Sequence, residues 1–157
     1  MEINESKLII SELTLRDLRI TNEVTETRRS ILRWLALALG IISPGESRLA
    51  AVSVLDALLY YQFQEKKDAD VPEMAQYISS KWGPINEKTL RYHLLQMKKA
   101  GIISNAKGKY FLQKGSGAGS ADESDISAWI GSYIDSRISP IKGKVSSVLK
   151  ELKARQF

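Results

Sequence analysis

The sequence contains no cysteine and only one histidine among its 157 residues. The absence of cysteine excludes disulfide scaffolds, thiolate zinc sites and thiol catalysis. His93 has no second imidazole with which to share a metal, so we interpret it as a half-buried packing residue rather than a ligand. The spacing of the carboxylates, Asp56 and Glu73 among them, matches no catalytic motif. We therefore expect no metal, no cofactor and no enzymatic activity.

Long apolar runs are also missing. The longest extends from Trp34 to Ile42, nine residues, whereas a membrane helix needs about 20. The chain begins with MEINESKL, which is acidic and lacks the basic-then-apolar order of a secretory signal. We therefore expect no membrane partner and a cytoplasmic location.

Positive charge is in small excess and is unevenly distributed. The 23 basic and 18 acidic side chains give a net charge of +5. Residues 86–114 contain seven basic side chains and one acidic side chain, a net +6, and residues 140–157 contain five and one, a net +4. Residues 115–139 are acidic, with a net −3. Because clustered cations favour binding to phosphates, residues 86–114 are the first candidate for a functional surface.

The apolar periodicity predicts a mainly α-helical fold with a small β-hairpin. The predicted helices cover about residues 26–40, 46–64, 71–82 and 86–100. Thr25 or Thr27 is suited to cap the first of them. A tight turn at residues 105–108 predicts the hairpin, whereas residues 5–21 are ambiguous between strand and helix.

The C-terminal third differs in composition from the rest. Residues 114–124 are rich in glycine and serine, which predicts a flexible linker. The alternative, a phosphate-binding loop, lacks the required glycine spacing and the Lys-Ser/Thr that should follow it. Residues 125–157 predict an amphipathic helix or helices, which Pro140 breaks or restarts.

The predicted helices 71–82 and 86–100 are separated by a short turn, which is typical of a helix-turn-helix. Asn86 is suited to cap the second helix, and Leu90, Leu94 and Met97 recur at a spacing that places them in the core. The hairpin that follows has the position of a wing. We therefore assign residues 46–113 to this domain, with residues 1–45 as an N-terminal helical extension used for packing or dimerisation.

A resemblance to a known superfamily lies in residues 86–103, NEKTLRYHLLQMKKAGII. The positions that carry it are Thr89-Leu90, His93-Leu94, Met97 and Ala100-Gly101-Ile102-Ile103. This segment resembles the recognition helix of winged helix-turn-helix regulators, such as the small bacterial and archaeal proteins of the MarR, ArsR and PadR type. The resemblance covers about residues 46–113 and implies a winged helix-turn-helix core with extra N-terminal and C-terminal helices. The metal-binding cysteine motifs of the ArsR type are impossible here.

We expect the helix 86–100 to lie in the major groove of double-stranded DNA and the wing 104–110 to contact the phosphate backbone. Arg91 is suited to guanine, Gln96 to adenine, and Tyr92 to a thymine methyl group or a phosphate. The predicted DNA-binding residues are Asn86, Lys88, Thr89, Arg91, Tyr92, Gln96, Lys107 and Lys109.

The apolar helices outside this core suggest a homodimer, although they could also pack on their own domain. The predicted dimerisation residues are Ile31, Trp34, Leu35, Ile126, Trp129, Ile130, Tyr133 and Ile134. We expect Arg28, Arg29 and Arg33 to be solvated or paired with Glu23 and Glu26, with phosphate binding as the alternative.

The hypothesis that follows is a dimeric, sequence-specific DNA-binding protein, a nucleoid-associated transcriptional regulator. The alternative is a winged-helix protein-interaction subunit of a transcription, replication or chromosome-organising assembly. A small-molecule effector is compatible with either, in an aromatic pocket near Trp34, Tyr60, Tyr61 and Trp82, but the sequence identifies no ligand.

Overall fold

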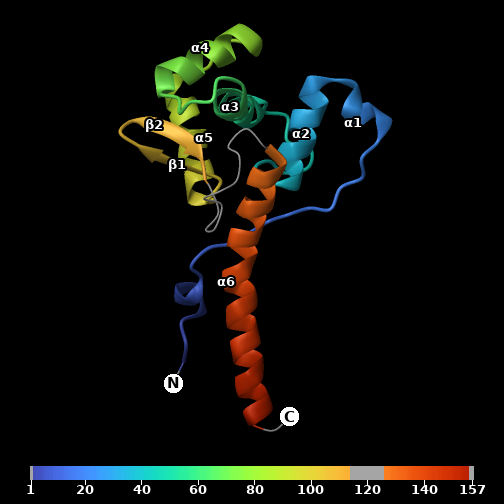
Figure 1. Cartoon of the computed structure of the whole chain (residues 1–157), viewed down its shortest axis with the longest axis vertical. Helices are drawn as coiled ribbons and strands as arrows, with labels where there is room; N and C mark the ends of the chain where they lie inside the picture. The colour runs from blue at the N-terminus through green and yellow to red at the C-terminus, as the bar shows by residue number, and fades with distance from the viewer. Residues whose placement is uncertain (1, 114–125, 156–157) are drawn as a thin grey trace. The chain divides into compact units, whose positions relative to one another are not determined.

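The computed structural model describes residues 2–113 and 126–155 (Figure 1). The chain forms two compact units, Met1–Leu112 and Gln113–Phe157. It is mainly helical with one small antiparallel hairpin, as the sequence predicted. The predicted linker, residues 114–124, lies outside the described residues. In the described part of the chain, no helix combines the length and the apolarity needed to cross a membrane.

The N-terminal extension contains the 3-10 helix η1 (Glu5–Leu8) and the helices α1 (Asn22–Glu26) and α2 (Arg28–Ala38). Thr27 caps α2: its hydroxyl accepts a hydrogen bond from the Ser30 backbone N–H at 3.1 Å, and the Ser30 hydroxyl accepts from the Thr27 N–H. This capping box satisfies two donors that the first turn of a helix leaves free.

The segment that the sequence left undecided is largely irregular, and Arg16 fixes it to the end of α2. The Arg16 guanidinium donates to the carbonyl oxygens of Leu37 at 2.7 Å and Ile42 at 2.8 Å. Gly40, at φ +73°, packs so closely that a Cβ atom there would lie 2.6 Å from the Thr14 carbonyl oxygen. The N-terminal segment therefore packs against the loop that follows α2 and holds it in place.

The centre of the first unit is α3 (Ala50–Leu59), whose residues 51–58 are all buried. It continues as the π-helical segment η2 (Tyr60–Gln64) and packs against α2, α4 (Val71–Lys81), α5 (Glu87–Lys99) and the hairpin. The prediction that this helix begins at residue 46 was wrong. The Glu46 carbonyl oxygen accepts a hydrogen bond from Arg33 at 2.6 Å, and its carboxylate accepts one from the Ser43 N–H, which hold residues 43–49 as a loop.

The hairpin pairs β1 (Ile103–Ala106) with β2 (Lys109–Leu112), and Ala106 faces Lys109 in the register. The two residues of its turn, Lys107 and Gly108, have φ angles of 53° and 78°. Two positive φ angles are typical of the primed turn that matches the twist of a hairpin. Ala69, which precedes α4, pairs with Tyr110 of β2 in an isolated antiparallel bridge. The backbone before α4 is thereby hydrogen-bonded to the hairpin.

The second unit contains α6 (Ile126–Ala154), a continuous helix of 29 residues with Pro140 inside it. The prediction that Pro140 breaks or restarts the helix was wrong. Proline removes one backbone donor and so leaves one carbonyl oxygen without its helical partner. That oxygen belongs to Ser136, four residues earlier, and the other hydrogen bonds of the 29-residue helix are sufficient to continue it through Pro140.

Candidate nucleic-acid interface

Helix α5 is held by one apolar face and a single N-cap. Leu90 and Leu94 are fully buried and Met97 is 3% exposed, as their spacing predicted. The Asn86 side-chain oxygen accepts a hydrogen bond from the Lys88 N–H at 2.7 Å, which confirms the predicted cap. The opposite face of α5 is therefore presented to solvent in a fixed orientation.

That solvent face carries most of the predicted DNA contacts. Lys88, Arg91, Tyr92 and Gln96 are exposed, and Thr89 is half-buried. Arg91 is bound to its neighbour Glu87 one turn earlier, with its Nε donating to a carboxylate oxygen at 3.0 Å. Both side chains of this pair are more than half exposed, so water competes with the interaction and the pair is weak.

The hairpin presents two further cations. Lys107 occupies the turn and Lys109 begins β2, and both are exposed. The hairpin is anchored at its other end, where the Leu112 N–H donates to the Gln62 side-chain oxygen at 2.9 Å. The structure thus places the predicted wing lysines at the tip of a short, fixed ribbon that contacts α5 through β1.

Beside α5 lies an open hollow of about 900 Å³. Lys88, Tyr92 and Gln96 lie along one wall, and the loop before α3 supplies Glu46 and Arg48. Sequence reasoning missed Arg48 because it assigned residues 46–49 to a helix. Pro44-Gly45 favours a turn but lies before this segment, and no signal within residues 46–49 marks them as a loop, which depends on the distant Arg33.

His93 lines the same hollow and is half-buried, as predicted. Burial lowers the pKa of His93, and the positive charge of Arg48 adds to this, whereas Glu46 opposes it. Burial therefore favours the neutral form of the imidazole. Among the described residues, no group of three histidine, cysteine or acidic side chains could hold a metal ion.

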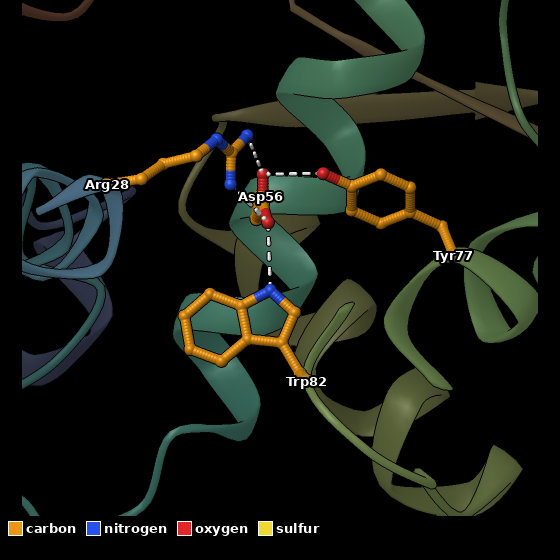
Figure 2. A network of polar contacts seen from close by, with 4 residues as sticks. All are labelled: Arg28, Asp56, Tyr77 and Trp82. Atoms are coloured by element: carbon orange, nitrogen blue, oxygen red, sulfur yellow. Dashed lines mark hydrogen bonds and ion pairs between the residues drawn. The ribbon is translucent and has the colours of Figure 1, made fainter. Parts of the chain in front are cut away.

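A buried polar network lies behind this surface, centred on Asp56 of α3 (Figure 2). The carboxylate is fully buried and accepts four hydrogen bonds. Arg28 donates two of them, one at 2.7 Å, while the Tyr77 hydroxyl donates at 3.1 Å and the Trp82 indole N–H at 2.8 Å. Residues from α2, from α3 and from the C-terminal half and C-cap of α4 are thereby joined at one carboxylate.

This network also fixes the turn that leads into α5. Trp82 is the C-cap of α4, four residues before Asn86. The Arg29 guanidinium lies 4.2 Å from the centre of the Trp82 ring and also donates to the Lys81 carbonyl oxygen, a cation–π contact. Arg28 and Arg29 are exposed, as expected of solvated side chains, but the alternative, pairing with Glu23 and Glu26, was wrong. Each of the three arginines Arg28, Arg29 and Arg33 instead binds a group more than ten residues away.

Tyr77 is the titratable group that this network perturbs most clearly. Burial and then the negative charge of Asp56 raise the pKa of Tyr77 to about 12. Its hydroxyl therefore remains protonated and continues to donate to Asp56 through the ordinary range of pH. The neighbouring carboxylate raises the pKa of Arg28 as well.

The predicted dimerisation residues differ in exposure. Ile31 of α2 is 41% exposed and Ile126 of α6 is 46% exposed. Trp34, Leu35, Trp129, Ile130 and Ile134 are half-buried, and Tyr133 is buried. The Trp34 indole donates to the Arg19 carbonyl oxygen at 2.9 Å, so part of this side chain is used within its own unit.

The aromatic residues predicted to surround an effector have separate partners. Tyr60 stacks on Tyr77 with 4.4 Å between ring centres, and the Tyr61 hydroxyl donates to the Glu73 carbonyl oxygen. The Trp34 indole donates to the Arg19 carbonyl oxygen, and the Trp82 indole donates to Asp56. The hollow beside α5 lies elsewhere and is lined by other residues.

Comparison of the chain with protein families, curated proteins and solved structures finds no match. The functional argument therefore depends on the geometry and chemistry of this chain.

Proposed function

We propose that the chain is a dimeric, sequence-specific binder of double-stranded DNA that acts as a transcriptional regulator. In this proposal α5 enters the major groove, with Arg91 on a base edge, and Lys107 and Lys109 contact the phosphate backbone. Asn86, Lys88, Thr89, Tyr92 and Gln96 complete the contacts. The location that fits this role is the nucleoid.

The observation that carries the proposal is the shared exposure of two cationic elements. The solvent face of α5 and the tip of the hairpin are both basic and are joined through β1. The element order also supports a winged helix-turn-helix. The helices α3, α4 and α5 are followed directly by the hairpin, the order from which a helix-turn-helix with a wing is inferred.

Arg48 extends the proposed interface. It is exposed and lines the same hollow as Lys88, which suits a contact to the backbone of one DNA strand. R48A should weaken binding to all sequences by a similar factor. It should also reduce the slope of log affinity against log salt concentration by about one, the value of one phosphate contact. K7A, which removes a cation from η1, is the matched control and should leave both unchanged.

Selection of binding sites from random duplex DNA tests the proposal directly. The expected result is a palindrome whose half-sites are about one helical turn apart, which reports specificity and dimerisation together. Recovery of no preferred sequence, with no DNA retained at physiological salt, would refute specific binding.

A protein-interaction role is the second candidate, and a specific observation favours it. Leu95 and Tyr92 on the solvent face of α5 are 47% and 56% exposed, which suits an apolar partner surface. L95K separates the two candidates, because an added cation should strengthen DNA binding but disrupt an apolar protein contact. The absence of DNA binding by both chains, with a stoichiometric protein partner that the unaltered chain binds and L95K does not, would favour the protein-interaction role.

A further inference from the structure

The second half of α6 carries a stripe of exposed aliphatic residues. The side chains of this stripe are between 47% and 67% exposed. Single exposed aliphatic residues are ordinary on a protein surface, but here five of them follow one line along a helix. Its members are Ile141, Val145, Val148, Leu149 and Leu152.

The spacing of the stripe is that of a coiled coil. Successive steps from Ile141 to Val145, Val148 and Leu152 are four, three and four residues, the alternation of the a and d positions of a heptad repeat. The seam is widened on one side by Leu149, which follows Val148. It lies entirely within residues 139–155, where every residue is exposed. The stripe therefore has the form of one half of a two-helix seam.

We infer that this seam binds the same seam of a second copy of the chain, with the two helices antiparallel. The stripe itself selects the register, because alignment of Ile141–Leu152 with the same segment of the second copy places the axis between Ser146 and Ser147. Ile141 then packs against Leu152 of the second copy, and Val145 packs against Val148. The antiparallel pair has four apolar layers, because the two-fold symmetry repeats each of these two contacts.

Charge complementarity supports the second copy as the occupant. In this register Lys144, which flanks the seam, lies opposite Glu151 of the second copy, and the symmetry repeats the pair. The methylene groups of Lys142 lie over Leu149 of the second copy. In a parallel pair Lys144 would instead lie opposite Leu149, and no opposite charges would meet.

This inference does not depend on the proposed function, because the seam shares no residue with α5 or the hairpin. It also differs from the dimerisation residues that the sequence predicted, which lie in α2 and in the first half of α6. A monomeric chain that still binds a preferred DNA sequence would overturn the seam and the dimeric state in the proposed function, but would leave sequence-specific DNA binding intact.

Sedimentation velocity of the full chain, over a range of concentrations, tests the seam. The expected mass is that of a dimer. V145E/V148E should raise the dimer dissociation constant by at least about 100-fold, because four carboxylates would enter apolar layers. S146E/S147E adds the same charge off the seam and is the matched control. A monomer in the unaltered chain, or equal dissociation constants for the two double variants, would overturn the inference.

Charge exchange tests the orientation. K144E places two carboxylates opposite each other, and E151K places two ammonium groups opposite each other, so each variant alone should dimerise on the order of 10-fold more weakly. A mixture of K144E and E151K chains restores both opposite-charge pairs and should recover the dimer. Residues 144 and 151 are two helical turns apart, so they do not affect each other within one chain.

Three results of the second experiment would overturn the antiparallel seam. One is a dimer that K144E does not weaken, as a parallel pair predicts. Another is a mixture of K144E and E151K that is no tighter than either chain alone. The third is flotation of the unaltered chain with anionic vesicles that V145E/V148E abolishes while the chain sediments as a monomer, because the stripe would then be a membrane-surface helix.

Discussion

The network around Asp56 and the basic surface of α5 and the hairpin belong to the same compact unit, yet their polar groups are held very differently. Asp56 is fully buried and accepts hydrogen bonds from three side chains on separate elements. Lys88, Lys107 and Lys109 are exposed, and within the described residues Arg91 is paired only with Glu87 on its own helix. The first group maintains the shape of the unit, whereas the second can exchange water for a partner at little cost.

The largest expected effect is on the buried side of this comparison. D56A and R28A should each lower the free energy of unfolding by about 3 kcal/mol, because each leaves buried polar partners or a buried charge without compensation. Arg28 is 62% exposed in its side chain, so water can solvate it in D56A, and R28A should therefore be the more damaging variant. Denaturant unfolding of both, with R48A as a surface control, measures this. A change below about 0.5 kcal/mol in both variants would contradict the role given to the network.

The next effect lies on the exposed side. R91A should weaken binding to the selected DNA site by about 1–3 kcal/mol and relax the preference at one base position. The free energy of unfolding should change by less than about 0.5 kcal/mol, because the Arg91–Glu87 pair is exposed. Fluorescence anisotropy with matched and mismatched duplexes gives the affinities. An equal loss on all sequences would reassign Arg91 from a base to a phosphate.

A smaller effect concerns Tyr77 and alkaline pH. An unfolded tyrosine loses its proton near pH 10, whereas the folded pKa of Tyr77 is about 12. The unfolded state therefore releases its proton first, and the stabilisation, which is complete below pH 10, is lost as the pH rises toward 12. Y77F should flatten this decline by on the order of 1 kcal/mol. Urea unfolding between pH 9 and about 11.5 measures it, and parallel curves for the two proteins would contradict the shift.

The smallest expected effect is a gain in DNA affinity rather than a loss. Glu87 repels phosphates and occupies Arg91, so E87Q should strengthen DNA binding by a few-fold. The same change removes an acidic residue from the first turn of α5, so it should slightly lower the free energy of unfolding. E5Q in η1 is the control and should alter neither quantity. Weaker DNA binding by E87Q would indicate that the carboxylate itself accepts from a base.

The sequence could predict features that depend on neighbouring residues. The burial of Leu90, Leu94 and Met97 follows from helical periodicity, the cap at Asn86 from its side chain, and the hairpin turn from a glycine next to a polar segment. These features define the basic surface, which is why the candidate DNA-binding residues could be named before the structure.

Contacts between distant residues could not be predicted. Asp56 and Arg28 are 28 positions apart, and nothing local to either residue shows that they meet. The loop at residues 43–49 depends on Arg33 in the same way. Pro140 was misjudged because a proline removes a single hydrogen bond from a helix, and the effect of that loss depends on how much helix remains on either side, here 29 residues in all.

The salt dependence of duplex DNA binding tests the central claim most directly. We expect the affinity of the unaltered chain to fall steeply as salt rises, because bound phosphates release counterions. K88A/R91A/K107A should abolish measurable binding at physiological salt and reduce the salt slope where binding remains, while the thermal unfolding midpoint stays unchanged. Equal affinities and equal salt slopes for the unaltered chain and the triple variant would contradict the assignment of α5 and the hairpin as the DNA-binding surface.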